Sequence, residues 1–297
     1  MRVTLRQHRA ALLWAIVAGT AVAVALVVTG LQLHALGPGW LGKTRASVDE
    51  PNDFVLVLQL GPVLAGMFIG APLLPREIEH GTAKLAWTQA ASRPRWLLAQ
   101  VLPVAALLVL VAVGLGTAFS WWQSPIGPAS AGFGPWSPEV FNLSPLLLPG
   151  WAVFGLALGV FFGAVTRRTL AAMAATLACY GALLYEVAYS WRMYYLTPLK
   201  DAATLILSAG GGYGSQARWG DQAVYVSQSL GFRDGRLLRS GYYPPVSWLR
   251  AHHIVMWWFY QPDSRYYPFQ LIELGWLTAA SVLLIAAASY LTQRRPA

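Results

Sequence analysis

Six long apolar runs constrain this sequence more than any other feature. One helical crossing of a bilayer requires roughly 20 consecutive apolar residues, and each run is about that long. The only acidic residues within the runs are Glu186 and Glu273, and no run contains a lysine. A water-soluble domain does not leave so much apolar surface uncovered. The sequence therefore predicts an all-α polytopic membrane protein with six spans, at residues 10–33, 54–74, 97–122, 146–165, 170–191 and 271–291.

Composition supports a membrane protein. Hydrophobic residues make up 56% of the chain and charged residues only 11%, whereas soluble globular domains carry roughly 25% charged residues. The mean hydropathy is +0.48. The net charge of +9 is therefore better explained by membrane topology than by nucleic-acid binding.

The distribution of basic residues predicts the orientation. With the N-terminus inside, the inner segments hold eleven basic and two acidic residues, and the outer segments hold ten basic and eight acidic residues. Eight of those ten outer basic residues fall in one long loop, which the positive-inside rule largely ignores. We therefore expect both termini to be cytoplasmic, in one transmembrane domain that spans residues 1–297.

The outer segment 192–270 is the only candidate for a separate folded region. QAVYVSQSL (222–230) is rich in β-branched and aromatic residues, GFRDG supplies turn residues, and RLLRSG can return as a second strand. This order predicts a β-hairpin. Residues 246–260 read as a short aromatic helix, too brief to cross a membrane.

No motif for catalysis, cofactor binding or metal binding stands out. GPGWLGKT (37–44) matches a phosphate-binding loop in spacing, but it follows a membrane span, Pro38 lacks an N–H, and no helix-forming run follows. The sequence contains no H-E-x-x-H, C-x-x-C or nucleophile elbow. Its single cysteine, Cys179, lies within the fifth span and is expected to be a buried, inert thiol.

Glu186 and Glu273 are candidate functional residues, because an ionisable group in hydrocarbon is costly and often marks a transport path. Both are expected near the outer ends of their spans, beside Arg192 and Arg265. Two interpretations remain open. The carboxylates form structural ion pairs or headgroup contacts, or they contribute to a substrate path or outer gate.

Gly155, Gly159 and Gly163 are spaced four residues apart in the fourth span, so they line one helix face. Small residues at this spacing let a neighbouring backbone approach closely. The pattern predicts helix packing. The neighbour is either another span of this chain, which we favour, or a second copy.

A charged, amphipathic insert separates the second and third spans. Gly81 can end one helix in the left-handed conformation, Thr82 can cap a new short helix, and Ser92 can cap the third span. Leu85 and Trp87 give the short helix an apolar side. The insert, residues 76–96, therefore predicts a short helix lying on the cytoplasmic surface; an ordinary interfacial loop is the alternative.

The insert resembles the coupling segment of ABC-2-type transporter permeases. The pattern is E-x-E-x-G-T-x-x-L-x-W-T-Q-x-x-S-R-x-x-W, from Glu77 to Trp96. It is most similar to the six-span, single-domain permeases common in high-GC Gram-positive bacteria. RQHR (6–9) and YQPDSRYYPFQLIE (260–273) fit the same family.

The resemblance implies a permease without catalytic activity of its own, bound to two copies of a cytoplasmic ABC ATPase that carries ATP and Mg²⁺. It also implies a second permease copy, forming a homodimer or a heterodimer. The segment that contacts the ATPase would include Arg76, Glu77, Glu79, Gly81, Thr82, Leu85, Trp87, Ser92 and Arg93.

We expect an exporter in the cell membrane, in contact with lipid and not with nucleic acid. Its cargo would be an amphipathic small molecule, peptide or lipid-like compound, since charge is scarce within the spans and the outer end is rich in tryptophan and tyrosine. The alternative function is a membrane-anchored sensor or assembly protein whose region 192–270 binds a ligand. A membrane enzyme is a weaker alternative, because no acid, base and nucleophile converge.

Overall fold

The computed structural model describes residues 9–35, 50–75, 93–125, 134–203, 206–207, 213–214, 223–239 and 244–294. The chain divides into two compact units. A helical unit comprises Met1–Glu186 and Gln270–Ala297, and a sheet unit comprises Val187–Phe269.

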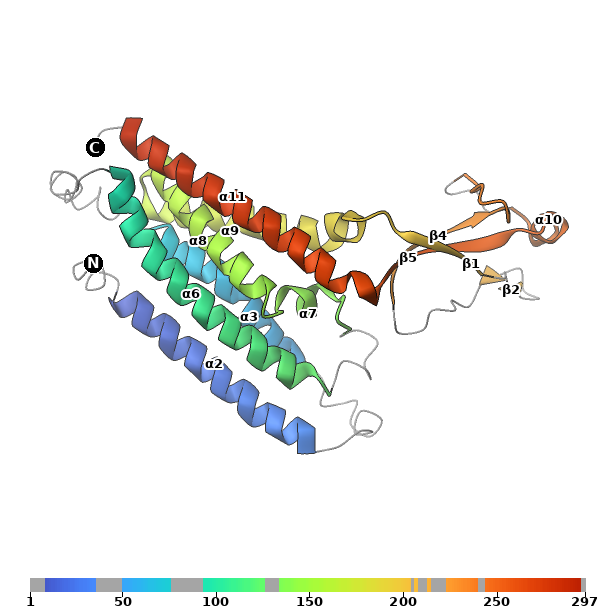
Figure 1. The fold of residues 1–297 in the computed structure, drawn as a ribbon, viewed down its shortest axis with the longest axis horizontal. Helices are drawn as coiled ribbons and strands as arrows, with labels where there is room; N and C mark the ends of the chain where they lie inside the picture. The colour runs from blue at the N-terminus through green and yellow to red at the C-terminus, as the bar shows by residue number, and fades with distance from the viewer. Residues whose placement is uncertain are drawn as a thin grey trace. The chain divides into compact units, whose positions relative to one another are not determined.

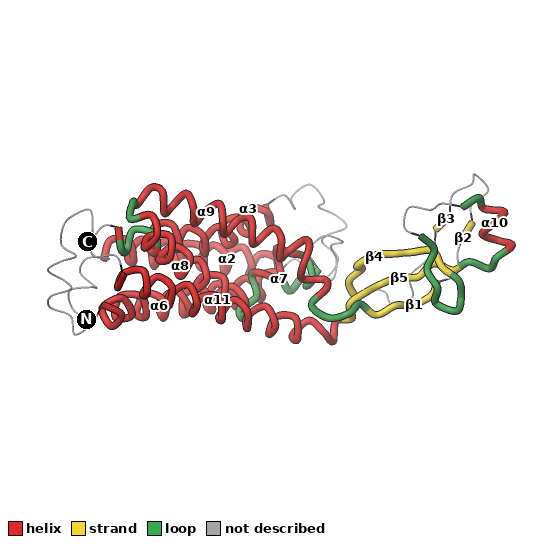
Figure 2. Tube along the Cα trace, turned by 90° about the horizontal axis from the view of Figure 1, so that it is seen from above, coloured by secondary structure: helices red, strands yellow, loops and turns green. Residues whose placement is uncertain are grey.

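The helices of the helical unit run alongside one another (Figures 1 and 2). They are α2 (Arg9–Ala35), α3 (Glu50–Ala65), α6 (Arg93–Gln123), the short α7 (Pro138–Asn142), α8 (Leu147–Thr166), α9 (Thr169–Glu186) and α11 (Tyr266–Arg294), which belongs to this unit from Gln270 onward. Among the described residues, five helices are long and apolar enough to cross a membrane: Val17–Ala35, Pro94–Gln123, Leu147–Thr166, Thr169–Tyr194 and Asp263–Arg294. A shorter apolar helix covers Val55–Gly70. Five of the six predicted spans therefore have full-length helices.

The second predicted span is not one regular helix. The α-helix α3 ends at Ala65, a π-helix η2 (Gly66–Gly70) follows, and residues 71–74 form turns. The Ala71 N–H donates to the Gly66 carbonyl oxygen, five residues earlier, at 2.8 Å. This is the hydrogen-bond pattern of a π-helix. Irregular backbone is tolerated at membrane depth where protein covers it, and Leu73 and Leu74 are buried.

Helix α8 is the most enclosed of the candidate spans: 78% of the residues in its apolar 18-residue stretch are buried. It contacts α3, η2, α6 and α9. Helix α2 instead packs mainly on α6, where the Trp122 indole N–H donates to Thr29 Oγ1 at 3.0 Å. Because α8 contacts several other elements of this unit, any movement of α8 has to move those elements as well.

Cys179 is exposed on the surface of α9, so the expectation of a buried thiol was wrong. The buried residues of α9 are Ala172, Thr176 and Tyr180. These positions are four residues apart and define the inward face of the helix. Cys179 lies outside this stripe.

The sheet unit contains a three-stranded antiparallel sheet in the order β1-β5-β4, shown side by side in Figure 2. The strands are β1 (Leu199–Ala203), β5 (Val255–Pro262) and β4 (Ala223–Gly231). A second antiparallel pair joins β2 (Ile206–Leu207) to β3 (Tyr213–Gly214). Leu230, Leu249, Ile254 and Met256 form the buried core of the unit.

Two expectations for this region need correction. The predicted helix 246–260 is only α10 (Val246–Ala251); His253 then takes a positive φ of 49° and β5 begins at Val255. The run VMWWFY favours strand by its β-branched and aromatic content, and it pairs with strands on both sides. The predicted hairpin is reduced to β4 and one isolated bridge, Gly231 with Leu237.

Buried Gln261 ties together the two ends of the sheet unit. Its Nε2 donates to the carbonyl oxygens of Met193 at 2.9 Å and Leu196 at 2.8 Å. Its Oε1 accepts from Arg265 Nη1 at 2.8 Å, and the same Arg265 atom donates to the Thr197 carbonyl oxygen. The segments by which the chain enters and leaves the unit are thus cross-linked by hydrogen bonds.

Candidate functional site

Within the described part of the helical unit, a seam of glycines lets the backbone of α8 approach the pair α3–η2 closely. A β-carbon built on Gly159 would lie 2.2 Å from the Gly66 carbonyl oxygen and 2.7 Å from the Ala71 nitrogen. A β-carbon on Gly66 would lie 2.4 Å from the Gly155 carbonyl oxygen. One on Gly70 would lie 2.6 Å from the Leu156 carbonyl oxygen. Because these atoms all belong to backbone, no side chain can turn away to make room.

The glycine seam extends to the end of the second span. A β-carbon on Gly163 would meet the Ala71 carbonyl oxygen at 2.8 Å and Pro75 Cδ at 3.0 Å. Pro75 is the last described residue before the predicted coupling segment. All three glycines of the fourth span therefore face the second span of the same chain.

The predicted ATPase-contact residues fall mostly outside the part of the chain that the structure describes. Outside it lie Arg76, Glu77, Glu79, Gly81, Thr82, Leu85, Trp87 and Ser92. Arg93 is the first residue of α6. The described structure thus fixes the two ends of the segment, Pro75 and Arg93.

Glu273 is fully buried in the helical unit. Its Oε1 accepts a hydrogen bond from the indole Nε1–H of Trp151 at 3.0 Å, which joins α11 to α8. Trp151 is itself 1% exposed and makes edge-to-face contacts with Phe154, Tyr180 and Trp276, at centroid distances of 5.9, 5.5 and 5.9 Å. Glu273 lies about two turns from the start of α11, in keeping with a position near one end of the span, and its carboxyl is buried within the protein.

The two candidate carboxylates have different surroundings. Glu186 is exposed at the last position of α9, immediately before the π-helix η4 (Val187–Trp191). Glu273 is fully buried and hydrogen-bonded to Trp151, so the two carboxylates do not share an environment. Arg265, expected beside them, uses Nη1 for Thr197 and Gln261.

A small cavity lies beside Trp151, with a volume of about 10 Å³. Its polar lining residues are Gln59, Asn142 and Tyr180. One water molecule needs a cavity of roughly 10–15 Å³. The cavity therefore holds no more than a water molecule, and it does not provide a cargo site.

A larger apolar groove of about 410 Å³ lies between α2 and α6. Gly19 and Gly114 line the groove without side chains to fill it, and Thr20 is its one hydroxyl-bearing residue. The other lining residues are Ala23, Val24, Val27, Val28, Leu110, Val111 and Leu115. This groove can take a hydrocarbon chain but offers little polar recognition.

Three residues of the candidate site were not predicted from the sequence: Trp151, Gly66 and Gly70. Gly66 and Gly70 have the same four-residue spacing as the glycines of the fourth span, so the spacing was a usable signal. Trp151 carried no comparable signal, since its partner Glu273 is 122 positions away. Among the described residues, no group of three His, Cys, Asp or Glu side chains is placed to hold a metal ion.

Comparison with known proteins identifies the family. No curated protein and no solved structure matches this chain. The family model described as ABC-2 membrane transporter related matches residues 16–192, more than half of the chain. The matched range contains α3, η2, α6, α8 and α9 with the whole glycine seam. It confirms the predicted family, and the chain belongs to the ABC-2 membrane transporter related family, as a multi-pass membrane protein.

Proposed function

We propose that this chain is the membrane-spanning permease subunit of an ABC exporter, driven by a separate cytoplasmic ATPase that binds ATP and Mg²⁺. The observation that carries the proposal is the family match over residues 16–192, which includes the spans on both sides of the predicted coupling segment. The working complex would contain two ATPase copies and a second permease copy. Its cargo would be an amphipathic small molecule, peptide or lipid-like compound.

The glycine seam supports a mechanism for coupling. The segment 76–92 connects Pro75, which packs against Gly163 across the seam, to Arg93 at the start of α6. Contacts between backbones contain no flexible side chain to absorb a displacement. A push from the ATPase on the segment would therefore move η2 and α8 together, and α6 from the other end.

The coupling segment can be tested by two substitutions measured in nanodiscs with the partner ATPase. Gly81→Val would oppose the left-handed turn by roughly 1 kcal/mol or more. Leu85→Asp would place a charge in the apolar contact, at a cost of about 2 kcal/mol, or about thirtyfold in ATPase affinity. We expect both variants to insert normally and to lose most cargo-stimulated ATP hydrolysis.

Leu237→Asp is the matched control for this experiment. Leu237 is exposed in the sheet unit, and the same leucine-to-aspartate change there leaves the coupling segment intact. We expect wild-type stimulation from this variant. Normal stimulation in both segment variants would remove residues 76–92 from the mechanism.

Orientation is a separate prediction, with both termini in the cytoplasm. Exposed Cys179 is first replaced by serine to remove background labelling. Single cysteines at Ser47, Ser130 and Ser229 should then react with a membrane-impermeant maleimide in intact cells, and a cysteine at Ser92 should react only after lysis. Labelling of intact cells at Ser92 alone would reverse the orientation.

The sensor or assembly alternative draws on the sheet unit, Val187–Phe269, which is compact in its own right. Purification of the chain from its native membrane distinguishes the two functions. A permease should bring down an ABC ATPase whose hydrolysis rises in the complex. Recovery of a regulatory protein in place of an ATPase would favour the sensor.

A further inference from the structure

One face of the sheet unit combines aromatic rings, hydroxyls and cations. Trp257 and Phe259 are two residues apart on β5, so they point to the same side of the sheet. The register places Ser229 and Ser227 of β4 beside them, and Lys200 of β1 beside Phe259. We call these residues, with Arg239, the basic sheet face.

The hydrophobic core lies on the opposite side of the sheet. Met256 and Trp258 alternate with Trp257 and Phe259 along β5, and both pack with Leu230 and Leu249 in the core. The core therefore covers the other face. On the basic sheet face the rings of Trp257 and Phe259 are half-buried, and the side chains of Ser227 and Ser229 are half-buried beside them.

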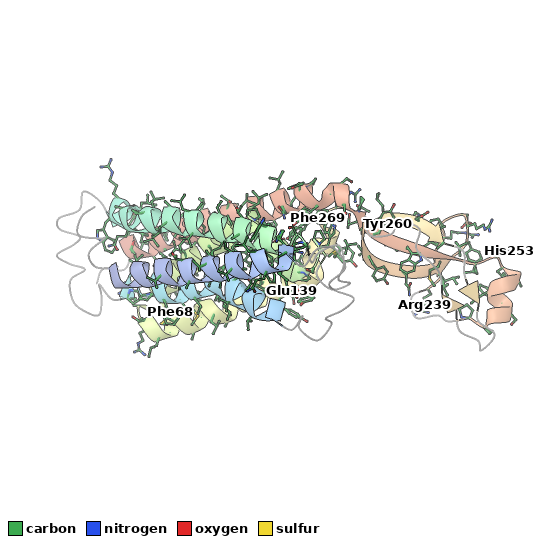
Figure 3. The ribbon with its side chains drawn as sticks, turned by 90° about the horizontal axis from the view of Figure 1, so that it is seen from below. Phe68, Glu139, Arg239, His253, Tyr260 and Phe269 are labelled. Atoms are coloured by element: carbon green, nitrogen blue, oxygen red, sulfur yellow. The ribbon has the colours of Figure 1, made fainter. Side chains whose placement is uncertain are left out.

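Cations stand at both edges of this face. Lys200 Nζ lies 5.1 Å from the centroid of the Trp257 ring, a cation–π contact that holds the ammonium over the sheet. At the other edge, the Leu238 N–H donates to the Leu230 carbonyl oxygen at 2.8 Å. This pairing puts the next residue, Arg239, across from Ser229 on the basic sheet face. Arg239 is exposed and is labelled in Figure 3.

The turn beside this face adds two more cations and one anion. Arg233 is exposed, and the Arg236 guanidinium lies 5.2 Å from the Phe232 ring centroid. Asp234 accepts from Arg236 Nε at 2.7 Å and from its backbone N–H at 3.0 Å. These hydrogen bonds lower the pKa of Asp234, and the bond from the Arg236 backbone has the larger effect. Asp234 therefore stays ionised and offsets one charge, while Asp201 of β1 alternates with Lys200 and faces the other way.

We propose that the basic sheet face binds an anionic glycan, meaning a polymer of sugar rings that carry carboxylate or phosphate groups. The cations provide charge-assisted hydrogen bonds to the acidic groups, the half-buried Phe259 ring provides flat apolar surface for sugar C–H groups, and the serines provide hydroxyls for sugar hydroxyls. The Trp257 ring holds Lys200 in place. A lipid surface fits less well. The rings of Trp257 and Phe259 are half-buried in the sheet face, and Lys200 lies over the Trp257 ring, so little apolar surface is left to enter a headgroup layer. Binding by this face does not depend on the proposed ATPase; only its exposure to the outside rests on the proposed topology.

The experiment uses the full chain in nanodiscs of neutral lipid, with binding measured by microscale thermophoresis. Two probes carry the proposed chemistry, decagalacturonate and a phosphomannan. Three comparators separate its parts: methyl-esterified decagalacturonate removes the charge, poly-L-glutamate removes the sugar rings, and phosphatidylglycerol vesicles present an anionic lipid surface. We expect at least one glycan probe to bind at least about tenfold more tightly than every comparator.

Variants locate the site. Lys200→Ser combined with Arg239→Ser should weaken glycan binding at least about tenfold, because two charge-assisted contacts are lost, and Phe259→Thr should weaken it with the charge unchanged. Arg168→Ser, an exposed arginine of the helical unit, is the control and should bind as wild type. Thermal melting confirms folding of each variant.

Three results would overturn the proposal: failure of both glycan probes to bind the wild type, equal binding of poly-L-glutamate, or tighter binding of the vesicles. Unchanged glycan binding by the Lys200/Arg239 double variant would also overturn it. Co-purification with an ATPase is unaffected by any of these outcomes, so the two proposals stand or fall separately.

Discussion

Alanine in place of Gly159 should prevent normal packing of α8 against α3 and η2. Its β-carbon would lie 2.2 Å from the Gly66 carbonyl oxygen, closer than two non-bonded heavy atoms can approach, so the helices must separate. Overpacking of a core typically costs about 1–3 kcal/mol. Since both partners here are backbone, we expect the upper end of that range. The measurement is the apparent melting temperature of the detergent-solubilised protein, together with its yield as a monodisperse peak.

The chain offers matched controls for this substitution. A β-carbon on Gly181 of α9 or Gly275 of α11 would meet nothing within 4 Å. Alanine at either position should leave the melting temperature unchanged or raise it, because alanine favours helix over glycine by about 1 kcal/mol. If Gly159→Ala has the same melting temperature as these control variants, the backbone contact is not what holds α8 in place.

Leucine in place of Glu273 is expected to be similarly harmful, for a different reason. Leucine cannot accept the hydrogen bond from Trp151 Nε1, so a buried indole N–H is left unsatisfied. An unsatisfied buried donor costs about 1–3 kcal/mol. Thermal melting and the yield of folded protein should both fall.

Glu273→Gln is the informative comparison, since the amide oxygen of glutamine can still accept from Trp151. We expect this variant to fold in nearly normal amounts but to transport poorly, because it removes the ionisable group and keeps the acceptor. Cargo efflux from proteoliposomes, normalised to folded protein, checks the prediction. A loss of folded protein as large as that of Glu273→Leu would make the carboxylate purely structural.

The spans were largely predictable from sequence because a bilayer imposes a length and a composition that each run must satisfy. The interruption of the second span was not. A π-helix at Gly66–Gly70 depends on which surface covers it, and that surface is supplied by α8. Strand β5 was misread for a related reason. The continuous apolar run VMWWFY has no periodicity that separates helix from strand, and its pairing with β1 is set by residues about 55 positions away.

The candidate site was predictable in proportion to how local its signals are. The glycines of α8 repeat within one helix, so their role in packing could be proposed from spacing alone. The hydrogen bond between Trp151 and Glu273 spans 122 positions, and nothing in either local sequence specifies the other. Burial of Glu273 likewise depends on packing between helices that are distant in sequence and meet only in the fold.

The glycine seam also limits how this gene can change. Every single-nucleotide missense substitution in a glycine codon encodes a residue with a β-carbon. At Gly66, Gly70, Gly155, Gly159 and Gly163 that atom would fall within 3.0 Å of a backbone atom across the seam. No one-step missense change is conservative at these positions, and compensation would require the opposing backbone to shift. In a saturation-mutagenesis library selected for function, these five codons should return as wild type alone, while Gly114, Gly181 and Gly275 accept alanine.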